Sequence, residues 1–137
     1  MIKGKDILRF IPQRYPMVML DEFEPCDEKS ARTALTVRTD NLFVDDMGEL
    51  HEPALIEHIA QSASALAGYN SQQSEAPIGI IGEVKHFVCH RRPLAGEKIE
   101  SEISFGFSFG NTTIATGTSR IDGEAIAEAQ LKIFMQQ

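Results

Sequence analysis

Hydrophobic positions between residues 52 and 70 recur at three- and four-residue spacing, which predicts one long helix. The apolar members of this pattern are Leu55, Ile56, Ile59, Ala60, Ala63, Leu66 and Ala67. Pro53 suits the first turn, because the N–H that proline lacks would have no intrahelical acceptor there. Glu57 is the one carboxylate inside this apolar run. A carboxylate in apolar surroundings is suited to acid/base chemistry, but the same spacing also fits a solvated glutamate on an exposed stripe.

Three shorter segments precede the long helix. Asp6 is placed to cap a short helix that ends at about Phe10, before Pro12. Residues 17–21 are expected to start a strand, and residues 31–38 alternate between apolar and polar side chains.

The chain after the long helix is predicted to be β-structure throughout. The expected strands cover residues 77–88, 99–109 and 124–135. The pairs at 110–111 (Gly-Asn) and 122–123 (Asp-Gly) are typical hairpin turns. Phe105, Phe107 and Phe109 share one side of their strand, and we expect them in the core rather than along a substrate tunnel.

A single long helix between early strands and a late antiparallel meander predicts an α+β fold, with a curved sheet wrapped around a central helix. The 137 residues are expected to form one domain, 1–137. Such a sheet has edge strands that need protection, and pairing with a second copy would provide it, so we expect a homodimer.

Composition narrows the function classes. The formal net charge of −7 argues against general binding of nucleic acid or anionic membranes. No segment has the length of a membrane span, and the start of the chain lacks a signal-peptide core, so a cytoplasmic location is expected. Cys26 and Cys89 form no disulfide framework, which agrees with a reducing compartment.

Four segments carry motifs that occur together in a known family. They are IPQRYPMVMLD at residues 11–21, EHIAQ at 57–61, GEVKHF at 82–87 and RPLAGEKI at 92–99. In the same order they resemble L-P-H-R-Y-P-F-L-L-V-D, E-A-M-A-Q, G-x-x-K-x-R-F and R-P-V-x-P-G-D-x-L. These are motifs of the hotdog-fold 3-hydroxyacyl-acyl-carrier-protein dehydratases of fatty-acid and polyene synthesis. The resemblance implies the hotdog fold.

The resemblance also implies a reaction, the loss of water from a 3-hydroxyacyl thioester to give the trans-2-enoyl thioester. The substrate is carried by the phosphopantetheine arm of an acyl carrier protein, and neither a metal nor a redox cofactor is needed. Glu57 matches the acidic catalytic residue of the family, whose partner is a histidine that usually comes from across the dimer interface. Backbone N–H groups near the start of the central helix polarise the thioester carbonyl.

The chain departs from the family where that histidine is expected. The family has G-H-F-P-G before the helix, whereas residues 42–51 here read LFVDDMGELH. Alignment on Phe43 places Asp46 at the histidine position, as a substrate-binding candidate. His51 lies just before the helix and is the candidate second catalytic group. The alternative is that His51 is a loop histidine that faces solvent.

Neighbouring polar residues on the helix are expected to have different roles. Gln61 lies one turn after Glu57 on the same face, where it is placed to orient Glu57 or contact the thioester arm. It also fits an ordinary surface glutamine. His58 points about a quarter-turn away and is expected to be structural or at the dimer contact. His86 and His90 would share a strand face but lack further ligands, so no metal site is expected.

Basic residues gather after the helix. Arg91 and Arg92, with Lys85 nearby in sequence, are candidates for docking an acidic carrier protein and the phosphate of its arm. The alternative is a solvated pair beside a turn.

Three functions remain open from the sequence. The first is an active dehydratase, similar to those of aryl polyene and flexirubin-type biosynthesis, that uses Glu57. The second is a hotdog thioesterase, in which the same carboxylate activates water or attacks the thioester. The third is a non-catalytic hotdog subunit that supports an active partner.

Overall fold

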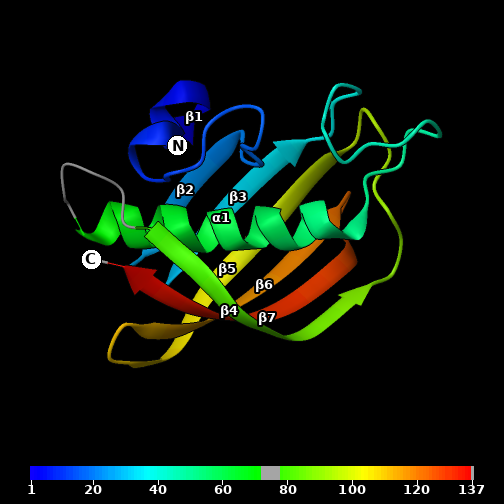
Figure 1. Cartoon of the computed structure of the whole chain (residues 1–137). Coiled ribbons are helices and arrows are strands. Elements are labelled where there is room, and N and C mark those ends of the chain that lie inside the picture. The colour runs from blue at the N-terminus through cyan, green and yellow to red at the C-terminus, as the bar shows by residue number, and fades with distance from the viewer. Residues whose placement is uncertain (72–77, 137) are drawn as a thin grey trace.

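The computed structural model describes residues 1–71 and 78–136. Its elements are β1 (Ile2–Lys3), the 3₁₀ helix η1 (Gly4–Arg9), β2 (Glu22–Asp27), β3 (Ser30–Thr36), α1 (Glu52–Ser71), β4 (Ile78–Cys89), β5 (Lys98–Phe109), β6 (Thr112–Ile121) and β7 (Glu124–Gln136). The strands of this described part pair antiparallel in the order β1-β2-β3-β5-β6-β7-β4. Figure 1 shows the curved sheet with α1 lying across its inner face. The predicted α+β architecture is confirmed.

The long helix begins and ends close to its predicted limits. Pro53 is its second residue, where a missing N–H costs nothing, and Glu52 places a carboxylate in the first turn. The helix is thin near its C-terminal end. A Cβ on Gly68 would collide with the backbone carbonyl of Phe10, so the segment after η1 packs directly on the helix backbone.

The core lies between α1 and the inner face of the sheet. Leu55 packs with Leu50 and Ile99 in one cluster, and Ile59 packs with Ile103 in another. The strand β7 alternates as expected from residue 127 onward, with its inward side chains buried against the helix. These are Ala127, Ala129, Leu131 and Ile133. The start of β7 departs from the pattern, because Ile126 is buried and Ala125 only partly so. Both hairpin turns are confirmed by positive φ angles at Gly110 (62°) and Gly123 (82°).

The prediction of a core phenylalanine stripe is wrong for two of its three members. Phe105 is half-buried, but Phe107 is 73% exposed and Phe109 is 77% exposed. The pairing of β5 with β6 shifts register between Phe105 and Ser108, which breaks the strict alternation that the sequence pattern assumes.

Two predictions for the N-terminal segment are also wrong. No side-chain hydrogen bond caps η1, whose N-cap is Lys3, so Asp6 is not a cap. Residues 17–21 do not start a strand, since β2 begins at Glu22. This segment is fixed instead by side chains of α1, namely Gln61 and His58. The expected strand start at residue 77 lies outside the described residues, which resume with β4 at Ile78.

Among the described residues, no helix combines the length and the apolar character needed to cross a bilayer.

Candidate functional site

Glu57 and Gln61 lie together on one face of α1. The Gln61 side chain is fully buried, and its Nε2 donates to Glu57 Oε1 at 3.1 Å. The same Nε2 donates to the carbonyl of Met17 at 2.8 Å, and Gln61 Oε1 accepts from the N–H of Met19 at 2.7 Å. Gln61 therefore fixes residues 17–19 against the helix and holds the half-buried Glu57 carboxylate at the same time.

Glu57 borders a small cavity. The cavity has a volume of about 230 Å³ and is lined by Gln13, Glu57, Ala60, Ser64, Ile81 and Ile133. Its walls come from α1, β4, β7 and the N-terminal segment. An acidic group at the edge of a small, partly apolar cavity is an arrangement that suits proton transfer to or from a bound molecule.

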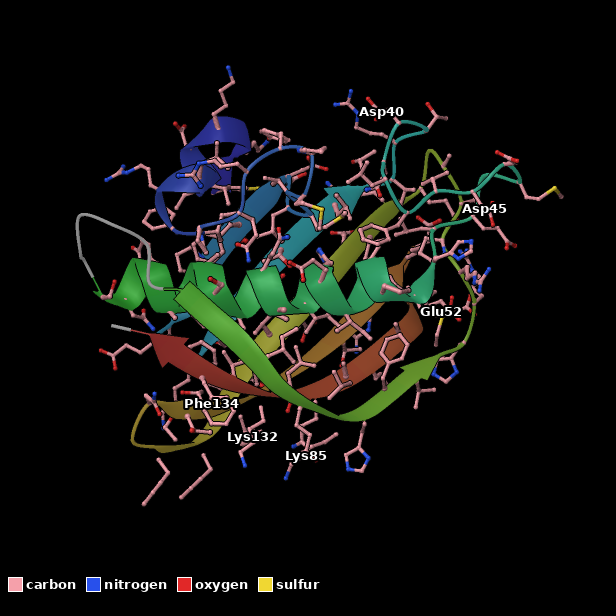
Figure 2. The ribbon with its side chains drawn as sticks, in the orientation of Figure 1. Asp40, Asp45, Glu52, Lys85, Lys132 and Phe134 are labelled. Carbon is pink, nitrogen blue, oxygen red and sulfur yellow. The ribbon has the colours of Figure 1, made fainter. Side chains whose placement is uncertain are left out.

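His51 is not among the residues that line this cavity. It lies just before α1, and its Nε2 pairs with Asp45 Oδ2 at 2.8 Å. Asp45 Oδ1 also accepts backbone N–H bonds from Met47 (2.9 Å) and Glu49 (3.0 Å). The bond from Glu49, followed by that from His51, holds the pKa of Asp45 below its usual value. Figure 2 shows Asp45 in the loop beside the N-terminal end of α1.

Asp46 and Asp45 differ sharply in their surroundings. Asp46 is exposed, and within residues 1–71 and 78–136 its side chain makes no hydrogen bond or ion pair. The sequence alignment singled out Asp46, whereas the structure gives the contact with His51 to Asp45. Asp45 could have been recognised from local sequence, because an aspartate side chain often accepts a hydrogen bond from the backbone N–H two residues later, here that of Met47, and so stabilises a turn.

His58 is buried in a polar network on the sheet side of α1. A carbonyl only accepts hydrogen bonds, so His58 Nδ1–H donates to the carbonyl of Met19 at 2.7 Å. Nε2 then accepts from the Ser101 hydroxyl at 2.8 Å, and the Ser101 and Ser119 hydroxyl oxygens lie 2.7 Å apart. Burial lowers the pKa of His58 from its ordinary value. The contacts within the chain are those of a structural histidine.

The three basic candidates for carrier-protein docking lie in two places: Arg91 and Arg92 after the end of β4, and Lys85 within β4. Arg91 forms a bidentate pair with Glu97, with both N–O distances at 2.8 Å. Arg92 binds Glu52 in the first turn of α1 at 2.6 Å, and this hydrogen bond is the main cause of the lowered pKa of Glu52.

Lys85 lies elsewhere, on the outer face of the sheet with Lys132 and Phe134 (Figure 2). The structure therefore does not bring Lys85 together with Arg91 and Arg92. In the described part of the chain, no three His, Cys, Asp or Glu side chains cluster as they would around a metal ion.

Sequence reasoning missed two polar residues of the cavity, Gln13 and Ser64. Signals for both were present in the sequence. Gln13 stands where the dehydratase motif L-P-H-R-Y-P has its histidine, and Ser64 follows Glu57 by seven residues, which returns it to the same helix face.

The curved sheet around one helix, with a carboxylate on the helix, defines a hotdog-fold protein. Among solved structures, the dehydratase heterocomplex ApeI:P from Xenorhabdus doucetiae is similar, with a TM-score of 0.87 and 17% identity over 96% of this chain and 91% of that chain. The E. coli PaaI protein from the phenylacetic acid degradation operon matches with a TM-score of 0.66 and 13% identity, over 82% of this chain and 81% of that one.

Sequence comparison then gives the family. The ApeP-like family, described as ApeP dehydratase, matches residues 5–137, and the chain belongs to this family. A 3-hydroxyacyl-[acyl-carrier-protein] dehydratase FabZ from Clostridium tetani is 26% identical over 96% of this chain and 94% of its own length. The FabZ of Campylobacter fetus is 25% identical over 98% of both chains.

Proposed function

We propose that this dehydratase removes water from a 3-hydroxyacyl thioester on an acyl carrier protein and forms the trans-2-enoyl thioester. Membership of the ApeP-like family and the names of the FabZ relatives support the reaction class. The observation in this structure that carries the proposal is Glu57, which Gln61 holds at the edge of a cavity. The ApeP-like match favours a polyene-type acyl chain.

The reaction requires two proton transfers. A base takes the proton from C2, the bond between C3 and its hydroxyl breaks as an acid protonates the oxygen, and the double bond forms between C2 and C3. Glu57 is proposed to exchange one of these protons, and its position at the edge of the cavity supports this role. The developing negative charge on the thioester oxygen would be favoured near the N-terminus of α1, where the helix dipole is positive.

His51 is the proposed second group within this chain. Its pair with Asp45 would fix the orientation of the imidazole, as a carboxylate commonly does for a catalytic histidine. Because His51 does not line the Glu57 cavity, the complete site is proposed to form in an assembly, either a homodimer or a pair with a second hotdog chain. Strand β4 lies at one edge of the sheet, where its backbone can pair with another strand. The ApeI:P heterocomplex is a precedent for the second arrangement.

The carrier protein is proposed to dock at the end of the molecule that carries Arg91 and Arg92. Both guanidinium groups are already paired with glutamates, so charge reversal would disturb the local structure as well as docking. Arg91→Gln is the gentler change, and Lys85→Gln on the outer face is its matched control. Turnover of the carrier-bound substrate should fall only in the Arg91 variant, whereas turnover of a short pantetheine thioester should be kept by both. Equal loss of turnover with both substrates would contradict docking at this surface.

A carrier-dependent reaction of this type is proposed to take place in the cytoplasm.

The deciding experiment follows 3-hydroxyacyl thioesters by mass spectrometry after incubation with the protein. The wild type should remove one water, Glu57→Gln should remove none, and Glu100→Gln, an exposed glutamate on β5, should behave as the wild type. His51→Ala shows whether that histidine takes part. Release of free acid would indicate a thioesterase instead. No reaction by the chain alone, followed by activity after addition of a partner hotdog chain, would indicate a supporting subunit.

A further inference from the structure

Two buried polar atoms of the described residues have no hydrogen-bond partner, Gln13 Oε1 and Ser64 Oγ. Ser64 is only 4% exposed. Both residues line the cavity that Glu57 borders. Buried polar atoms without partners are rare and costly, so two of them at one small cavity, beside a carboxylate, indicate that the cavity holds something polar.

Ser62, on the same helix, shows that an unpaired hydroxyl is not a general property of α1. Its Oγ donates to the carbonyl of His58 at 2.7 Å and lies 2.8 Å from Thr33 Oγ1. Ser62 is fully buried and fully bonded, whereas Ser64 faces the cavity with a free hydroxyl. The hydroxyl of Ser64 therefore lacks a partner because it faces the cavity, and not because it lies on α1.

Water fits this cavity in size and chemistry. A volume of about 230 Å³ has room for several molecules, since each takes up about 30 Å³ in the liquid. Ser64 follows Glu57 by seven residues, which is about 10 Å along the helix axis, so no single water can contact both. A short file of waters can contact both, with Gln13, from the N-terminal segment, as a further polar partner.

We propose that Gln13 and Ser64 are positioning residues that hold a file of waters running from Glu57, and that this file receives the water eliminated from C3. The inference rests on the proposed function. In the elimination the C3 hydroxyl leaves with a proton from the acid, while the base keeps the proton from C2. The new water then needs polar partners, and the remaining walls, Ala60, Ile81 and Ile133, offer none through their side chains.

The first test is structural and does not depend on turnover. A high-resolution crystal structure of the wild-type protein, in the assembly that it forms in solution, should show ordered water within 2.7–3.2 Å of Ser64 Oγ and Gln13 Oε1, as hydrogen-bond geometry requires. Ser64→Ala should lose the water at that position. A dry cavity, or one filled by a side chain of another subunit, would overturn the inference.

The second test follows the fate of the oxygen. A thioester with ¹⁸O in its 3-hydroxyl is allowed to dehydrate and rehydrate in unlabelled D₂O, and ¹⁸O loss is divided by deuterium gain at C2. In Ser64→Ala and Gln13→Met the eliminated water has no polar route away and returns to C3 more often. This ratio should therefore fall at least threefold.

The control variants separate positioning from folding. A defect in folding lowers both isotope exchanges together and leaves their ratio unchanged, which is the result expected for Ser62→Ala. Ser64→Thr keeps the hydroxyl and should restore the wild-type ratio. An unchanged ratio in Ser64→Ala and Gln13→Met would refute the role of these residues even if the protein is a dehydratase. Absence of any dehydration would refute the proposed function, and the crystallographic waters would still decide whether the file exists.

Discussion

Gln61 on α1 and Met19 in the segment before β2 are joined by a buried hydrogen bond of 2.7 Å, from the backbone N–H of Met19 to Gln61 Oε1. The amide nitrogen of Gln61 completes the arrangement by donating to the carbonyl of Met17 and to Glu57. One buried side chain thus replaces the partners that a strand would have given residues 17–19, and it orients the candidate catalytic carboxylate.

Replacing this amide should affect both folding and chemistry. Gln61→Leu keeps a similar volume but leaves the N–H of Met19 and the carbonyl of Met17 unpaired, which should lower the free energy of unfolding by about 2 kcal/mol or more. Urea denaturation measures this change, and thioester turnover should fall because Glu57 loses its contact. The control Gln130→Leu, at a half-buried position of β7, should change stability by less than about 0.5 kcal/mol. Equal unfolding midpoints for both variants would contradict the role of Gln61.

The sequence predicted the helix and the late hairpins well because periodicity and turn chemistry are local properties. Glu57 and Gln61 could be placed on one helix face for the same reason. The bond between Gln61 and the backbone of residues 17–19 spans more than 40 positions in the chain, and no local pattern reports it.

Failures of prediction occurred where non-local pairing decides the outcome. The register shift in β5 exposes Phe107, although the alternation of that strand favoured burial. Residues 17–20 have a strand-like composition but bind to α1 instead of a neighbouring strand. Lys85 and Arg92 are close in sequence but lie on different parts of the molecule. Lys85 lies within β4 beside Lys132 and Phe134, whereas Arg92 follows the end of β4 and binds Glu52 at the start of α1.

Gly68 should be intolerant of any side chain. A Cβ at this position would collide with the backbone carbonyl of Phe10, which cannot rotate away as a side chain can. Gly68→Ala should therefore lower the free energy of unfolding by about 1–3 kcal/mol, although alanine favours helices. Gly106→Ala is the control, since its added Cβ would come no closer than 3.8 Å to the Ile114 carbonyl. A gain in stability for Gly68→Ala would show that the two segments do not touch in solution.

His58 should make stability depend on pH in a defined direction. Burial lowers its pKa below the ordinary value of 6.5, so below that pH the unfolded chain takes up a proton that the folded chain does not. The free energy of unfolding should therefore be highest above about pH 6.5 and fall as the pH decreases, by at most about 1.4 kcal/mol per pH unit from this group. His58→Gln should reduce this slope, whereas His86→Gln, at an exposed position, should keep it. Identical slopes in the wild type and His58→Gln would contradict the assignment.

Asp45 and Asp46 form a natural matched pair for testing the loop before α1. Asp45 accepts N–H bonds from Met47 and Glu49 and binds His51, whereas Asp46 is exposed. Asp45→Ala should lower the Tm and, by releasing His51, lower turnover, while Asp46→Ala should change neither. Because the pKa of Asp45 is lowered, its contribution to stability should be complete above its ordinary value of 3.8 and be lost as the pH falls below it. Thermal unfolding and turnover of the two variants, measured side by side, check both statements. A turnover defect confined to Asp46→Ala would mean that the aspartate aligned with the family histidine acts in the reaction directly, without His51.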